Sequence, residues 1–144
     1  MVNAPVTVGL EIHDLEMLEL VHLMTEHVGR ASGLDEDAAH WLSVAVRECV
    51  VNGLTHGNGG DPRKAVHVEF TTTPSSDSIE LVVSVRDQGD GFDADALPDP
   101  CAPENLLRTS GRGIHLVRQF MDDVSFQRVA GGGMEVRMIR RISR

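Results

Sequence analysis

The spacing of apolar residues alternates along the chain between the period of a strand and the period of a helix. A weak alternation over 6–12 predicts an edge strand. Apolar residues recur every three or four positions over 15–28 and again over 38–53, which predicts two amphipathic helices. Asp14 and Asp35 precede these stretches and are residue types that cap helix N-termini. The first third of the chain is therefore predicted to be a strand followed by two helices.

Strict alternation predicts an antiparallel hairpin in the middle of the chain. Apolar residues alternate over 65–70 and again over 79–85, and the segment 74–77 between them has the composition of a turn. Asp87 continues the parity of the apolar residues in the second of these strands. The pattern therefore places a carboxylate on the core-facing side of a strand end, where an apolar residue is expected.

The last third of the chain opens with a long run that has no regular period. Residues 93–103 are rich in Pro, Asp and Ala, and the irregular run continues to about residue 112. A connection longer than an ordinary loop is typical of a lid over a site or of a disordered segment. A helix is then predicted over 114–121, and strands over 124–129 and 134–139 flank three successive glycines.

The order of these elements predicts one domain over residues 1–144. A chain of this length buries a two-layer core without disulfide bonds. The predicted fold class is α/β (α+β), a two-layer sandwich in which helices cover one face of a mixed, mostly antiparallel sheet.

Charge and composition exclude several classes of function. The formal net charge of -9 argues against direct nucleic-acid binding, which needs clustered Lys and Arg. The basic run over 137–144 is interpreted as a solvent-exposed face and tail. Two cysteines without CxxC spacing indicate neither a zinc site nor a disulfide framework, and Cys49 has the phase of a core residue. No stretch reaches transmembrane length and no leader pattern opens the chain, so we expect a cytoplasmic protein without membrane association.

Three motifs are candidates for chemistry, and each has an ordinary structural interpretation. Asp87, Gly89 and Gly91 follow a predicted strand. Such a group is commonly a turn, and by itself the turn is favoured. In the functional interpretation, a buried carboxylate accepts a hydrogen bond from an exocyclic amine such as that of adenine, and the glycines let the base approach closely.

Gly111, Arg112 and Gly113 precede the third predicted helix. Glycines at a helix start expose backbone N–H groups that bind phosphate, although two glycines are equally typical of a flexible hinge.

Glu48, Asn52 and His56 recur every fourth residue along the second predicted helix and therefore share one stripe. A solvated polar stripe is the simplest interpretation. Alternatively, the Asn52 carbonyl oxygen is a hard ligand for Mg²⁺, and Glu48 orients or deprotonates the group that attacks a phosphoryl centre.

Taken together in their order along the chain, the motifs resemble the ATP-binding (Bergerat) fold of the GHKL superfamily. The resemblance consists of E-x-x-x-N on a helix, D-x-G-x-G after a strand, and G-x-G-I at a helix start. Residues 112–124 and 133–138 resemble most closely the small stand-alone anti-sigma-factor serine kinases. The resemblance covers about residues 10 to 141.

The resemblance implies a role for each motif. Glu48 is implied to be the catalytic base, Asn52 the Mg²⁺ ligand and Asp87 the residue that reads adenine. His56 occupies a family position whose role is positional. Further residues are implied to shape or close the nucleotide site: Gly89, Gly91, Arg108, Gly111, Arg112, Gly113 and Ile114.

One residue departs from the family pattern. The family usually has a threonine after the last hairpin's glycine, and its hydroxyl supports the adenine-binding Asp. Met134 stands there in this chain. The loss of one hydrogen bond, about 0.5–1.5 kcal/mol, predicts weaker adenine binding unless a water substitutes.

The function implied is an ATP- and Mg²⁺-dependent serine protein kinase that acts as an anti-sigma factor. Its implied partners are a STAS-domain anti-anti-sigma protein, which is the substrate, a sigma factor, and a second copy in a homodimer. The alternative is a non-catalytic module that binds ATP or a partner. A histidine-kinase-type ATPase domain is a weaker fit, because the first predicted helix is too short for a phosphoacceptor helix pair.

Overall fold

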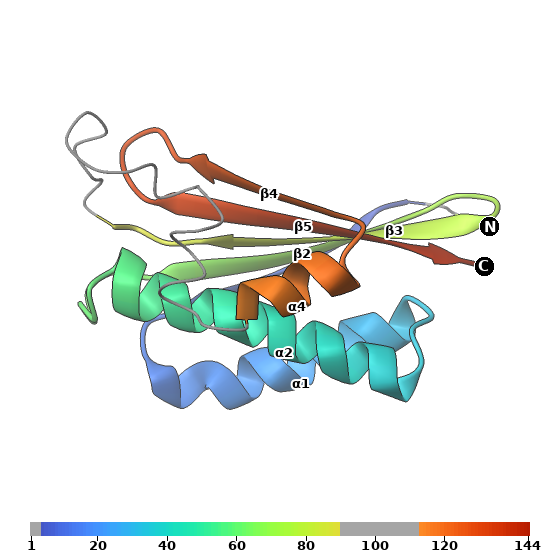
Figure 1. Cartoon of the computed structure of the whole chain (residues 1–144), viewed down its shortest axis with the longest axis horizontal. Coiled ribbons are helices and arrows are strands. Elements are labelled where there is room, and N and C mark those ends of the chain that lie inside the picture. Colours follow the sequence, from blue (N-terminus) through green and yellow to red (C-terminus); the bar gives the residue numbers. More distant parts are fainter. Residues whose placement is uncertain (1–3, 90–112) are drawn as a thin grey trace.

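The computed structural model describes residues 4–89 and 113–144, and in the second range side chains are described from residue 117. Three α-helices of these ranges cover one face of a five-stranded sheet (Figure 1). Some predicted features lie outside the described residues: Gly91, Arg108, Gly111, Arg112 and the predicted lid over 93–112.

The helices begin where the sequence places capping aspartates. The Asp14 side chain accepts a hydrogen bond from the Glu16 backbone N–H, at the start of a 3₁₀ turn, Leu15–Met17, that leads into α1, Leu18–Ala31. The Asp35 side chain accepts one from the Ala38 backbone N–H at the start of α2, Glu36–Asn52. The two predicted helices are confirmed; Asp35 caps α2 as predicted, whereas Asp14 caps the 3₁₀ turn ahead of α1.

The remaining elements follow the predicted order. They are the π-helix Gly53–Gly57, β2 Val66–Pro74, β3 Ser78–Arg86, α4 Gly113–Phe120, β4 Asp123–Arg128 and β5 Met134–Ser143, with β1 Val6–Ile12 ahead of the helices. The sheet order is β1-β2-β3-β5-β4, and the four pairings among these strands are all antiparallel. The two-layer arrangement with helices on one face is confirmed, and no parallel pair occurs between these five strands.

The core lies between the helical layer and the sheet. Val66, Val68 and Phe70 of β2 are buried on the same face as Leu81 and Val83 of β3, as strict alternation predicts. The helices contribute mostly aliphatic side chains to this core: Val21, Leu42, Val46 and Val50 are fully buried. The small number of aromatic residues is thus matched by an aliphatic core.

The C-terminal basic run is part of the sheet rather than a tail. β5 extends to Ser143 because Ile142 pairs with Ile79 and is buried at the end of the strand. The interpretation of a solvent-exposed tail is wrong for Arg140. Its Nη1 donates to the Phe120 carbonyl oxygen at 2.6 Å, and its guanidinium lies 4.5 Å from the centre of the Phe120 ring. Arg140 therefore ties the last turn of α4 to the sheet.

Candidate functional site

The C-terminal end of α2 reaches the sheet at the end of β3. The α-helix ends at Asn52 and the chain continues as a π-helical turn that carries His56 and Gly57. Gly53 permits this close approach, because a Cβ atom there would lie 2.9 Å from Val66 Cγ2 at the start of β2. A π-helical turn inside a helix is often found at functional sites.

Asp87 follows β3 directly and lies opposite the first residue of β5. Its backbone N–H donates to the Met134 carbonyl oxygen at 3.0 Å, which continues the pairing of β3 with β5 by one residue. Its carboxylate Oδ1 accepts from the backbone N–H groups of Gly89 at 3.0 Å and Met134 at 3.1 Å. The side chain at 134 has no hydroxyl, but the backbone at that position holds the carboxylate.

Three glycines from different segments surround the Asp87 carboxylate. A Cβ atom at Gly57 would lie 2.2 Å from Oδ2, and one at Gly89 would lie 3.2 Å from Oδ1 and 2.4 Å from the Gly57 carbonyl oxygen. Gly133 has φ +98, and a Cβ there would lie 2.2 Å from the Asp87 carbonyl oxygen. The backbone therefore approaches Asp87 in a way that residues with side chains cannot.

Asn58 connects the end of the helix to the residue before β2 and to the segment after β3. Its Nδ2 donates to the Ala65 carbonyl oxygen at 3.0 Å, and its Oδ1 accepts from the Gln88 backbone N–H at 2.7 Å. Gln88 Oε1 in turn accepts from the Ala65 backbone N–H at 2.7 Å. Asn58 is 4% exposed, so these hydrogen bonds are shielded from water and hold the segment carrying Asp87 against the helix end.

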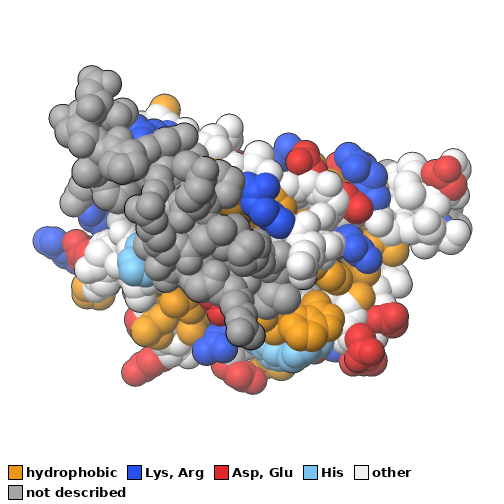
Figure 2. Space-filling model, in the orientation of Figure 1, with side chains coloured by type: hydrophobic (Ala, Val, Ile, Leu, Met, Phe, Trp, Pro, Cys, Tyr) orange, Lys and Arg blue, Asp and Glu red, His pale blue; other side chains and the backbone are white. Residues whose placement is uncertain are grey.

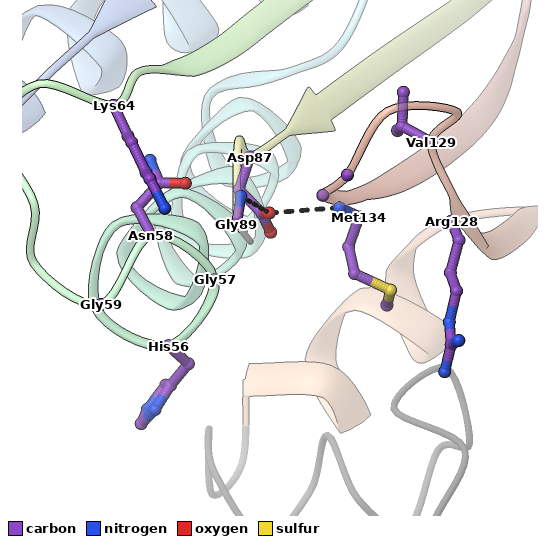
Figure 3. A pocket seen from close by; sticks show the side chains of 12 residues that line it. His56, Gly57, Asn58, Gly59, Lys64, Asp87, Gly89, Arg128, Val129 and Met134 are labelled. Atoms are coloured by element: carbon purple, nitrogen blue, oxygen red, sulfur yellow. Dashed lines mark hydrogen bonds between the residues drawn. The ribbon is translucent and has the colours of Figure 1, made fainter. Parts of the chain in front are cut away.

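These elements enclose a pocket of about 410 Å³. Figure 3 shows Asp87 and Gly89 between the helix end and Met134, while the His56 ring points away from Asp87. The lining comprises His56, Gly57, Asn58, Gly59, Lys64, Asp87, Gly89, Arg128, Val129, Gly132, Gly133 and Met134. A pocket of this size, with one buried carboxylate among glycines, is typical of a small-molecule site.

The electrostatics of the pocket centre on Asp87, which is 8% exposed. Burial raises the pKa of this carboxyl above its ordinary value; the N–H groups of Gly89 and Met134 and the charge of Lys64 oppose the shift without cancelling it. Oδ2 accepts no hydrogen bond within the described part of the chain. The carboxylate thus has one oxygen held by two backbone N–H groups, and no described residue donates a hydrogen bond to the other.

The raised pKa predicts how the stability of the ligand-free protein depends on pH. Because the folded state binds the Asp87 proton more tightly than the unfolded state, this group's contribution to stability is lost as pH rises from the ordinary carboxyl range through the folded pKa. Asp87→Asn lacks this titration and retains an oxygen that accepts the same two N–H groups. Denaturant unfolding from pH 4 to pH 8 should show the variant gaining stability relative to wild type as pH rises. A constant difference would contradict the shift.

Glu48 and Asn52 lie on α2 ahead of the pocket and are half-buried. They do not line the pocket around Asp87. Cys49, next to Glu48, is 3% exposed. Burial first, and then the negative charge of Glu48, raise the pKa of its thiol to about 12, so it stays protonated at neutral pH and is the core residue expected.

The structure brings together part of the predicted set. His56, Asp87, Gly89 and Met134 line one pocket, whereas Glu48 and Asn52 precede it on the same helix. The described backbone begins α4 at Gly113 and Ile114, as the sequence predicts. The roles assigned to these residues remain predictions.

Several lining residues were missed by sequence reasoning. Gly57 follows the second predicted helix and Gly133 lies in the glycine run of the last predicted hairpin, and only the fold places them against Asp87. Asn58 follows the helix in a glycine-rich stretch where a polar residue is unremarkable, so its burial had no sequence signal. Lys64 and Arg128 carried no signal either, because Lys64 only precedes the predicted strand over 65–70 and Arg128 lies within the predicted strand over 124–129.

A comparison with protein-family models matches residues 13–140 to the histidine kinase-like ATPase domain. The chain belongs to this family. The GHKL resemblance drawn from the three motifs is therefore confirmed, and membership in this ATPase family implies ATP binding. Within the described residues, no helix combines the length and the apolar character needed to cross a bilayer.

Known relatives of this histidine kinase-like ATPase domain include kinases and anti-sigma factors. The chain is 29% identical over 122 residues to the serine-protein kinase RsbW of Bacillus velezensis, covering 81% of this chain and 74% of the relative. It is 31% identical over 107 residues to an anti-sigma F factor of Oceanobacillus iheyensis, covering 72% and 69%. These similarities extend over most of the fold.

A solved structure has the same fold. A chain in the SiaB–SiaC complex from Pseudomonas aeruginosa superposes with a TM-score of 0.61 at 14% identity, covering 92% of this chain and 88% of that one. At this identity the likeness concerns the architecture alone.

Proposed function

We propose that this protein is an ATP- and Mg²⁺-dependent serine protein kinase that acts as an anti-sigma factor and phosphorylates a STAS-domain anti-anti-sigma protein. The observation that carries the proposal is the Asp87 carboxylate, surrounded by three glycines at the end of the helix that bears Glu48 and Asn52. The names of the relatives, a serine-protein kinase and an anti-sigma factor, supply the reaction and the partner class.

The residues present fit an adenine nucleotide. Asp87 Oδ2 accepts no hydrogen bond within the described residues and is suited to an exocyclic amine, while Oδ1 is held by two backbone N–H groups. The absence of side chains at Gly57 and Gly89 lets their backbone pack directly against Asp87, and the pocket beside the carboxylate has a volume of about 410 Å³. Met134 offers an apolar side chain to the same pocket instead of a hydroxyl.

The residues also fit a magnesium ion held mainly by phosphate oxygens. Among the described residues there is no group of three His, Cys, Asp or Glu side chains that forms a metal cage. Mg²⁺ at a nucleotide commonly takes only one or two protein ligands, and the Asn52 carboxamide oxygen is a hard donor of the required kind. ATP with Mg²⁺ would supply the phosphoryl group and offset the charge that develops during its transfer.

Nucleotide binding and proton transfer would then take place at different positions along α2. Asp87 and the glycines orient the base at the C-terminal end of α2. Glu48, nine positions before Gly57 and so about 13 Å along the helix axis, would accept the proton of the substrate serine hydroxyl. The half-buried setting of Glu48 limits the number of waters that compete with that hydroxyl.

Phosphotransfer from radiolabelled ATP tests the proposal directly. Wild-type protein is incubated with Mg-ATP and, one at a time, with the STAS-domain proteins of the source organism. We expect one of them to acquire one phosphate on serine, and the label to be absent when EDTA removes Mg²⁺. Reaction with none of them would overturn the kinase proposal.

The same experiment distinguishes a non-catalytic binding module. The position of Glu48 and Asn52 outside the pocket lining and the methionine at position 134 are the observations that favour it. Nucleotide binding by calorimetry and capture of a sigma factor, without phosphate on any STAS protein, would establish that alternative.

A further inference from the structure

The tryptophan of this chain is exposed on the outer face of the helical layer. Trp41 lies in the first half of α2 and is 46% exposed. It is the chain's one tryptophan. Tryptophan is mostly buried in folded proteins and is enriched among the residues that dominate protein–protein binding. A tryptophan left this exposed on a regular helix is therefore a candidate for partner contact.

Trp41 shares a stripe of α2 with Glu48. The two residues are seven positions apart, which places them about 20° apart around the helix and about 10 Å apart along its axis. Val44 lies between them on the same stripe and is half-buried. A partner lying along this stripe would contact Trp41 and Val44 while one of its side chains reaches Glu48.

Neighbouring rings hold Trp41 in place. The His40 ring packs edge-on against the Trp41 ring, with centres 5.5 Å apart, and the His22 ring of α1 lies 6.5 Å from His40. His22 in turn lies 2.6 Å from a carboxylate oxygen of Glu26. Figure 2 shows hydrophobic and histidine side chains side by side over the first turns of α2. This row across two helices limits the freedom that Trp41 would lose on binding.

The charge beside Trp41 is negative. Asp37 lies one turn before it on the same stripe and is exposed, whereas the carboxylate of the adjacent Glu36 lies 3.7 Å from Arg30 Nη1. A partner surface with an apolar side chain opposite Trp41 and a basic side chain opposite Asp37 would be complementary to this end of the helix.

We propose that Trp41, Val44 and Asp37 form the docking surface for the protein whose serine is phosphorylated. The proposal rests on the kinase function proposed above, because the position of Glu48 on the same stripe is what selects the serine-bearing protein as the occupant. An apolar side chain of that protein packs on Trp41 about two helical turns from the serine hydroxyl. Trp41 acts in substrate binding and takes no part in the chemical step.

Steady-state kinetics of Trp41→Ala test this surface, with the STAS-domain protein that wild type phosphorylates as the substrate. We expect its KM to rise about 10-fold or more, with kcat at saturation within about twofold of wild type and ATP affinity unchanged. Trp41→Phe should recover part of the loss, and Asp37→Lys should raise the KM as well. Thermal unfolding of each variant, measured alongside, shows whether the fold is intact.

Leu23→Ala is the matched control, since Leu23 is a 55% exposed apolar residue on α1 and lies outside the stripe. It should leave the KM for the STAS protein unchanged. If Trp41→Ala matches wild type in an active kinase, the docking surface is wrong and the kinase proposal stands. If it weakens only sigma-factor capture, the occupant is wrong. If wild type phosphorylates no STAS protein, both proposals fail.

Discussion

Replacing Glu48 by Gln is expected to lower the rate of phosphotransfer about 100- to 10,000-fold, the usual range for removing a general base. Glutamine has the same shape but does not accept the proton of the substrate hydroxyl. Glu48 does not line the pocket around Asp87, so the affinity for ATP should stay within about twofold of wild type. Single-turnover transfer of labelled phosphate, together with calorimetric titration of ATP, separates the two quantities.

Glu19→Gln provides the control for loss of one negative charge, because Glu19 is an exposed carboxylate on α1. Its phosphotransfer rate should equal that of wild type. Equal losses of nucleotide affinity and transfer in Glu48→Gln would show that Glu48 binds the nucleotide or supports the fold, and the assignment as base would be withdrawn.

Replacing Gly57 by Ala is expected to remove adenine recognition although Asp87, the residue proposed to recognise adenine, is not itself substituted. The new methyl group would occupy the position of Asp87 Oδ2, so the carboxylate must rotate and lose its hydrogen bonds to Gly89 and Met134. We expect ATP affinity to fall about 10-fold or more and the free energy of unfolding to fall by about 1–3 kcal/mol. Calorimetry and denaturant unfolding measure the two effects.

Asp87→Asn should cause a similar loss of affinity with the opposite effect on stability at neutral pH, because it removes a buried charge whose pKa is raised. Gly9→Ala is the control for replacing a glycine by alanine where the added methyl group causes no clash, since a Cβ atom at Gly9 meets no atom within 4 Å. In the double variant of Gly57 and Asp87, the affinity losses should be far from additive. Additive losses would place Gly57 outside the recognition of adenine.

The fold could be predicted from the sequence where the spacing of apolar residues along one element shows which of its side chains are buried. Alternation identified β2 and β3 because one face of each is buried. The end of β5 could not be predicted from the sequence, because Arg140 and Arg141 interrupt the apolar pattern before Ile142, which is buried in the core. The pairing of β3 with β5 depends on contacts distant in sequence that no local pattern encodes.

The candidate site, too, could be predicted from the sequence only in part. Asp87 was predicted from its parity in the strand, and its burial confirms that position. The contacts that define its surroundings come from Gly57 and Gly133, which are distant in sequence and carry no side chain that a pattern could report. Asn58 could not be predicted for another reason. An asparagine that is buried and hydrogen-bonded to the backbone cannot be distinguished in the sequence from an asparagine in a solvent-exposed loop.

The attachment of α4 through Arg140 has a mechanical consequence. The guanidinium holds the carbonyl group and the ring of Phe120, the last residue of this eight-residue helix, and its Nε is buried without a partner in the described structure. Val117, three residues before Phe120, is fully buried in the core, so the C-terminal half of α4 is held at two points. Gly113, the first residue of α4, lies about 10 Å from Phe120 along the helix axis and is the part of the helix farthest from the Arg140 contact.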